Sequence, residues 1–111
     1  MPELKLVLHV NQGDRWPAAL SNLRNLARDY PALPVRVVVN GTAVQTLAGG
    51  NAVREQVVGF ADAGIAVQLC ANALREHAVP QEALPAAFQV VPAGVVALAE
   101  AQQEGYAYVK P

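Results

Sequence analysis

Short apolar runs alternate along the chain with longer segments in which apolar residues recur every three or four positions. Four of these runs are rich in Val, Leu and Ile: LKLVLHV (4–10), VRVVVN (35–40), IAVQLC (65–70) and FQVV (88–91). Runs of this kind, separated by segments of helical length, predict strands of a parallel sheet that is covered on both faces. The ending YAYVKP alternates in character and predicts one further strand.

The segment after the first run gives the clearest helix. Asp14 is a suitable N-cap, and five apolar residues then recur on one face: Trp16, Leu20, Leu23, Ala27 and Tyr30. The sequence YPALP ends this helix, because proline cannot continue it.

Helices are also predicted between the later runs. GTAVQTLAGG (41–50) forms a loop or a short helix, and Asn51 then caps a helix that ends at Gly64. Another helix follows IAVQLC, and Pro80 either ends it or starts a short new one. AGVVALAEAQQEG (93–105) forms the last helix.

This alternation of strands and helices defines the expected fold class. Right-handed crossovers between parallel strands place helices on both faces, so we expect a three-layer α/β/α sandwich with a mostly parallel sheet of about five strands. The chain has 111 residues and no linker or internal repeat, which indicates a single α/β domain over residues 1–111. In such sheets a functional site is expected at the carboxyl ends of the strands.

Composition restricts the classes of protein and of partner. Hydrophobic residues make up 53% and charged residues 15%, yet no apolar run approaches the ~18 residues of a membrane span. So much apolar residue on a small domain predicts burial between subunits, and we expect a homo-oligomer. The net charge is −1 and the basic residues are scattered, which argues against nucleic acid or a membrane as a partner.

The start of the chain and its cysteine content indicate a compartment. MPELKLVLHV has no basic region before its apolar run and no small-residue cleavage site, so we interpret it as a first strand rather than a signal peptide. A single cysteine cannot form a disulfide within the chain, in agreement with a reducing environment. We therefore expect the protein in the cytoplasm.

Cys70 is the main candidate for chemistry. Asn11, Asn40, Cys70 and Pro92 all fall at or just past the ends of predicted strands. Cys70 also precedes a helix, whose free N–H groups and dipole favour a thiolate. A free cysteine is, however, among the residues most often buried as a small hydrophobic side chain, so position alone favours packing over reaction.

Three polar residues are candidate neighbours of this thiol. Asn72 could donate to a thiolate, or bond only to the local backbone. His9 could act as a proton acceptor or electrostatic partner if its strand lies close to that of Cys70, while a structural role is the alternative. His77 lies two helical turns from Cys70 and is not expected to share its site.

Other kinds of site lack support in the sequence. Neither a GxxxxGK[ST] motif nor a GxGxxG motif after a strand occurs, and two histidines with one cysteine give no metal-ligand spacing. The only serine, Ser21, falls in the middle of a predicted helix rather than in a nucleophile elbow. We therefore predict no cofactor and no metal, and we assign any covalent chemistry to Cys70.

Four stretches in order carry a resemblance to a known family: KLVLHVNQGD (5–14), VVVNG (37–41), GIAVQLCANALREH (64–77) and VVPAGVVALAEAQQEGYAYVKP (90–111). Together they resemble the DsrE-like (DsrE/DsrF-like) family of small intracellular sulfur-relay proteins. The resemblance implies an α/β sandwich that assembles into trimers or hexamers, and a cysteine that carries sulfur as a persulfide. Cys70 matches the position of that cysteine.

The resemblance thus implies a sulfur carrier, or a sulfurtransferase-like protein, that holds sulfane sulfur on Cys70 and passes it on. The acceptor is another protein or a small thiol, because the chain has no second cysteine. Four side chains are candidates for binding the persulfide: His9, Asn11, Asn40 and Asn72.

Two alternatives stay open at this point. One is a small-ligand-binding module in which Cys70 only lines the pocket. The other is an interaction module without catalytic activity, with Tyr106, Tyr108 and Val109 at the interface between subunits.

Overall fold

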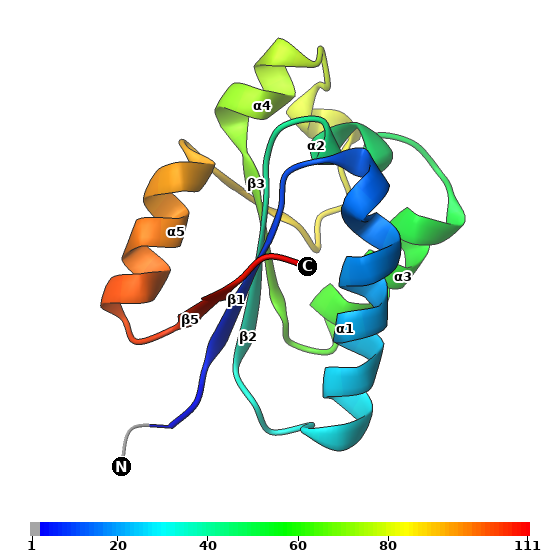
Figure 1. Ribbon diagram of the computed structural model, residues 1–111. Coiled ribbons are helices and arrows are strands. Elements are labelled where there is room, and N and C mark those ends of the chain that lie inside the picture. Colours follow the sequence, from blue (N-terminus) through cyan, green and yellow to red (C-terminus); the bar gives the residue numbers. More distant parts are fainter. Residues whose placement is uncertain (1–2) are drawn as a thin grey trace.

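The computed structural model describes residues 3–111, which form one five-stranded sheet with helices on both faces (Figure 1). The strands are β1 (Leu6–Val10), β2 (Val35–Val39), β3 (Ala66–Cys70), β4 (Gln89–Val91) and β5 (Ala107–Val109). Their order in the sheet is β4-β3-β2-β1-β5, and every neighbouring pair is parallel. The expected α/β sandwich is confirmed, and its sheet is entirely parallel.

The helices divide unequally between the two faces. They are α1 (Trp16–Asp29), α2 (Ala43–Thr46), α3 (Ala52–Asp62), α4 (Ala71–Glu76) and α5 (Gly94–Gln103), with short 3-10 helices η1 (Gly13–Arg15) and η2 (Gln81–Ala83). In Figure 1, α1 and α3 cover one face of the sheet, α5 alone covers the other, and α2 and α4 lie at the edge where β2 and β3 end.

The alternation of side chains along the strands builds two hydrophobic cores. The larger lies beneath α1 and α3 and includes the fully buried Leu8, Val37 and Leu69. The smaller lies beneath α5 and consists of five buried residues: Val7, Val38, Ala97, Leu98 and Ala101. Each fully buried Val or Leu contributes about 1.5–3 kcal/mol, so the larger cluster supplies most of the hydrophobic stabilisation.

The first helix begins and ends differently from the prediction. Asp14 lies inside η1, and α1 starts at Trp16, with Arg15 at the N-cap position and Pro17 in the first turn. Proline suits the first turn because its missing N–H would have no helical partner there. Tyr30 is the C-cap residue and is 64% exposed, so the buried face of α1 is shorter than the sequence pattern indicated.

The start of α3 agrees with the prediction. The Asn51 side chain accepts a hydrogen bond from the Arg54 N–H at 2.8 Å, and it also donates to the carbonyl oxygens of Thr46 and Gly49. Pro80 is the N-cap residue of η2 and does not end α4, which stops at Glu76. Within the described residues, no helix has both the length and the apolar character needed to cross a membrane.

Candidate functional site

The carboxyl ends of three central strands bring the predicted polar residues to one edge of the sheet. Asn11 follows β1, Asn40 follows β2, and Cys70 is the last residue of β3. The Asn40 N–H donates to the Val10 carbonyl at 3.1 Å, which continues the ladder between β1 and β2. Pro92 follows β4 and is exposed. The expectation that a site forms at this edge therefore has a geometric basis.

Cys70 lies between a strand and two helices. It is the last residue of β3 and the N-cap residue of α4, and its side chain makes no capping hydrogen bond. Only 6% of the residue is exposed, and its thiol is free. The residue is therefore sheltered from water, and its sulfur forms no disulfide bond.

Asn40 and Cys70 both lie against Gly94, the first residue of α5. A Cβ atom on Gly94 would lie 3.2 Å from the Cys70 Cβ and 3.3 Å from both the Cβ and the Nδ2 of Asn40. Glycine permits this close approach because it carries no side chain. The Asn40 amide, the Cys70 side chain and the first turn of α5 thus surround one small region.

His9 belongs to the same group of residues but does not reach Cys70 directly. Its Nε2 lies 2.8 Å from Asn40 Oδ1, and its Nδ1 lies 2.6 Å from the Tyr108 hydroxyl. A direct role for His9 required β1 to lie close to β3, and β2 separates these two strands. The polar contacts of His9 in this group are therefore with Asn40 and Tyr108.

Tyr108 is the residue of this group that the sequence did not connect with His9; one of the alternatives drawn from the sequence put it at a subunit interface. In the sheet, Tyr108 is level with Val7, so it shares a face with His9 two residues further along β1. The two rings are 5.6 Å apart at their centroids. Alternation in YAYVKP indicates which face Tyr108 occupies, but not that β5 pairs with β1.

Asn11 lies on the other side of Asn40 and packs against the next turn. Gly41 has φ +55°, and a Cβ atom there would collide with the Asn11 carbonyl oxygen, so this turn requires glycine. The Asn11 Oδ1 atom is buried and has no hydrogen-bond partner among the described residues. This oxygen can therefore accept a further hydrogen bond at the same edge of the sheet.

Asn72 and His77 point to other parts of the surface. Asn72 is exposed, and its Oδ1 accepts a hydrogen bond from the Arg75 guanidinium within α4. His77 Nδ1 lies 3.3 Å from the side-chain nitrogen of Gln45. Neither residue joins the group formed by His9, Asn40 and Tyr108.

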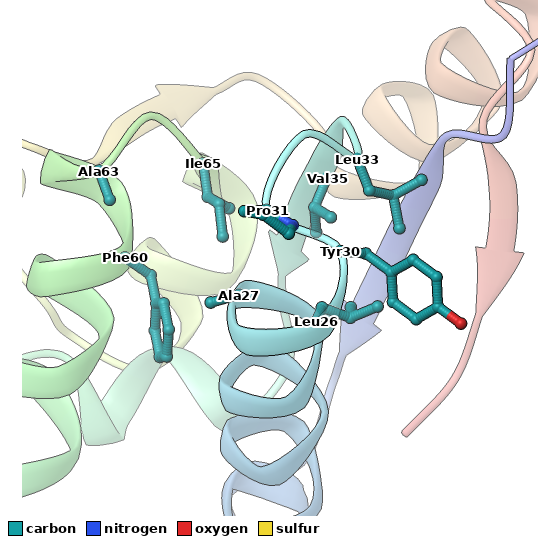
Figure 2. A pocket seen from close by; sticks show the side chains of 9 residues that line it. All are labelled: Leu26, Ala27, Tyr30, Pro31, Leu33, Val35, Phe60, Ala63 and Ile65. Carbon is teal, nitrogen blue, oxygen red and sulfur yellow. The ribbon is translucent and has the colours of Figure 1, made fainter.

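Two hollows on the surface are separate from Cys70. An apolar hollow of about 210 Å³ lies between α1 and α3. Figure 2 shows Tyr30, Phe60 and Ile65 among the residues that line it. It lies near the amino ends of β2 and β3. A polar hollow of about 350 Å³ beside the ends of β1 and β2 is lined by Gln12, Gly13, Asp14, Thr42, Gln45 and Thr46.

The fold and the site define a class of protein: an all-parallel α/β sandwich whose only cysteine is buried at the carboxyl edge of its sheet. Residues 18–111 match the DsrE/DsrF-like family. The chain belongs to this family, as its sequence resemblance indicated. None of the proteins with curated functions matches the chain significantly.

Solved structures share the fold. MTH1491 from Methanobacterium thermoautotrophicum, described as a protein of unknown function, is 27% identical, with a TM-score of 0.88 over 98% of this chain and 100% of its own. The ychN protein from E. coli is 15% identical, with a TM-score of 0.82 over 97% of this chain and 99% of its own. BT1422 from Bacteroides thetaiotaomicron is 14% identical, with a TM-score of 0.78 over 96% and 94%. The last two show a shared fold only.

Proposed function

We propose that the protein is a sulfur carrier that holds sulfane sulfur as a persulfide on Cys70 and passes it to a partner thiol. Membership of the DsrE/DsrF-like family supports a role in sulfur relay. The observation that carries the proposal is the position of the only cysteine, free and 6% exposed, against the first turn of α5. A thiol in that position is sheltered and has polar groups beside it.

The proposed chemistry is two successive exchanges between sulfur atoms. The Cys70 thiolate attacks the outer sulfur of a donor persulfide, a new S–S bond forms on Cys70, and the donor leaves as a thiolate. An acceptor thiolate then attacks the outer sulfur on Cys70, takes it as its own persulfide and releases the Cys70 thiolate. Each step makes and breaks one S–S bond, so neither an oxidant nor a cofactor is consumed.

The surroundings of Cys70 suit a persulfide anion. The first N–H groups of α5 have no carbonyl partner within the helix, and Gly94, which begins this helix, lies against the Cys70 side chain. The Asn40 amide borders the same region. These donors stabilise a charged sulfur without acid–base catalysis, which this transfer does not require.

The acceptor must be a second molecule, since Cys70 has no partner cysteine in the chain. We also propose that the protein lies in the cytoplasm, because donor and acceptor thiols are kept reduced there. Sulfur donor and acceptor proteins, or small thiols, are therefore the partners that the proposal requires.

We further propose that the protein works as a homo-oligomer, a trimer or a hexamer. Val95 and Val96 on α5 are 67% and 53% exposed, and Tyr108 is 42% exposed on the same face of the sheet. Burial of these side chains between copies would cover the face that α5 alone leaves open. Light scattering after size exclusion should give a trimer or hexamer mass, and Val95→Lys with Val96→Lys should lower it. A monomer mass for the wild type would contradict this part.

A ligand-binding module is the second candidate function. The polar hollow lined by Gln12, Asp14 and Thr42 favours it, because it opens beside the strand ends where such folds bind ligands. In that case Cys70→Ser would leave ligand binding intact, and no transferable sulfur would be found on the wild type.

Intact-protein mass spectrometry tests the main proposal. Wild type and Cys70→Ser are incubated with polysulfide or a persulfidated donor protein, measured, and measured again after a reductant. The proposal predicts a gain of one or more sulfur atoms in the wild type only, reversed by the reductant. If a control thiol protein gains sulfur under the same conditions and the wild type does not, sulfur carriage by Cys70 is wrong.

A further inference from the structure

We propose that His9 and Tyr108 are positioning residues that hold the Asn40 amide with its NH₂ group toward Cys70, where it donates a hydrogen bond to the charged sulfur. The inference rests on the proposed function, because it assigns how the sulfur anion of that site is stabilised. It concerns a row of three side chains, Tyr108 on β5, His9 on β1 and Asn40 directly after β2, beside Cys70 at the end of β3.

The hydrogen bonds of His9 determine which ring nitrogen carries the proton. Asn40 Oδ1, 2.8 Å from His9 Nε2, can only accept a hydrogen bond, so Nε2 must be protonated. In a neutral ring Nδ1 is then an acceptor, and the Tyr108 hydroxyl, 2.6 Å away, donates to it. The direction of donation therefore runs from Tyr108 to His9 and from His9 to Asn40.

The same bond determines what Asn40 presents to Cys70. With Oδ1 directed at His9, Nδ2 lies on the opposite side of the amide, 3.3 Å from the point where a Gly94 Cβ would be. That point is 3.2 Å from the Cys70 Cβ. Asn40 thus turns its NH₂ group, rather than its oxygen, toward Gly94, and Gly94 also lies against Cys70.

The opposite orientation of the amide would have the reverse effect on the sulfur. It would place Oδ1 toward Cys70, and an acceptor oxygen repels a thiolate or persulfide anion. A donor on His9 Nε2 selects the orientation that favours the anion, and the Tyr108 hydroxyl supplies the hydrogen that Nδ1 of this tautomer accepts. Tyr108 and His9 therefore act on the sulfur without touching it.

The tautomer of His9 is measured directly by ¹⁵N NMR on the wild-type protein in alkaline buffer. The proposal predicts that the neutral ring carries its proton on Nε2. A ring protonated on Nδ1 would overturn the proposal, since Asn40 would then have to present its NH₂ group to His9. Because no variant is involved, the measurement does not depend on whether a variant folds.

The effect on Cys70 is measured by the rate of alkylation with iodoacetamide as a function of pH. His9→Leu should slow alkylation at neutral pH by about tenfold, the usual size of one hydrogen bond to a charged group, and leave the limiting rate at high pH unchanged. Tyr108→Phe should shift the pH profile in the same direction, but by a smaller amount. His9→Gln should recover most of the alkylation rate that His9→Leu loses, because the glutamine Nε2 replaces that of the imidazole.

Matched controls separate positioning from a general change in structure. His77→Leu and Tyr106→Phe alter the other histidine and a neighbouring tyrosine outside the row, and should leave the pH profile unchanged. A lowered limiting rate at high pH in His9→Leu would indicate altered access to Cys70 and would overturn the proposal, as would an unchanged profile. Alkylation needs no sulfur donor, so failure here is distinct from failure of the sulfur-loading experiment.

Discussion

Gly94 lies so close to Cys70 that a methyl group on Gly94 would be 3.2 Å from the Cys70 Cβ. The same methyl group would be 3.3 Å from two atoms of Asn40. The close packing of α5 against the buried Cys70 thus depends on the glycine at the start of this helix. The start of α5, rather than a deep pocket, defines the space available to a sulfur atom on Cys70.

Gly94→Ala is expected to disturb both stability and the thiol. Overpacking of this kind costs about 1–3 kcal/mol, partly offset by the better helix propensity of alanine, and we expect the free energy of unfolding to fall by about 1 kcal/mol. The rate of Cys70 alkylation should fall as well. Gly59→Ala on α3 is the matched control, because a Cβ there meets nothing within 4 Å. Urea unfolding that showed equal effects of the two substitutions would contradict the packing argument.

Gly41→Ala is expected to lower the free energy of unfolding by more than Gly94→Ala. The residue has φ +55°, and the added Cβ would collide with the Asn11 carbonyl oxygen, which is backbone and cannot turn away. Left-handed backbone alone costs a non-glycine residue about 1–2 kcal/mol, so the total loss should exceed that of Gly94→Ala. Thermal unfolding measures it. Ala78→Gly provides the converse test, because Ala78 has φ +55° and glycine should relieve its strain; a large loss of stability there would count against the explanation.

Asn51→Ala should remove the cap of α3. The Asn51 side chain accepts from the Arg54 N–H, and loss of such a cap costs about 1 kcal/mol. Asn51→Asp keeps the acceptor and should recover part of the loss, though not the two bonds donated to Thr46 and Gly49. Chemical denaturation of the wild type and the two variants gives the comparison. If Asn51→Asp were no more stable than Asn51→Ala, the donated bonds would be the dominant contribution.

Glu104→Gln should have a small effect that depends on salt. Glu104 Oε2 lies 2.6 Å from Arg36 Nη1, and the Arg36 guanidinium also stacks 4.3 Å from the Tyr106 ring centroid. Because the Glu104 side chain is 55% exposed, we expect a loss of about 0.5 kcal/mol in low salt and less in high salt.

The pH dependence of this pair follows from Arg36. Partial burial lowers the Arg36 pKa and the hydrogen bond to Glu104 raises it, with a net upward shift. A cation with a raised pKa contributes its stability at every pH below its unfolded value, so Arg36 adds no pH dependence near neutrality. Urea unfolding at several neutral pH values should give the same difference between wild type and Glu104→Gln.

Local patterns predicted the strands and one cap because the responsible residues are adjacent in sequence. The four apolar runs contain four of the strands, and Asn51 caps the helix that directly follows it. Asp14 misled the prediction because a 3-10 turn intervenes before α1, and nothing in the pattern distinguishes such a turn from the helix itself.

The arrangement around Cys70 could be predicted only in part. That Asn40 and Cys70 end neighbouring strands is a local property, whereas the contact between His9 and Tyr108 joins residues 99 positions apart. It depends on the strand order, and short apolar runs carry no information about which edge of the sheet the last strand joins. The hydrogen bond between His9 and Asn40 depends on the same order.

Strand β5 has three residues, lies at the edge of the sheet and, within residues 3–111, pairs with β1 alone. Short edge strands open more often than central ones, because they have fewer bonds to break. Each opening of β5 removes the Tyr108 hydroxyl from His9 Nδ1, which then loses its hydrogen-bond partner in the protein. The reactivity of the buried Cys70 sulfur would then depend on whether β5, three strands away, is docked on the sheet. Hydrogen exchange at Tyr108 and the reactivity of Cys70 should therefore vary together.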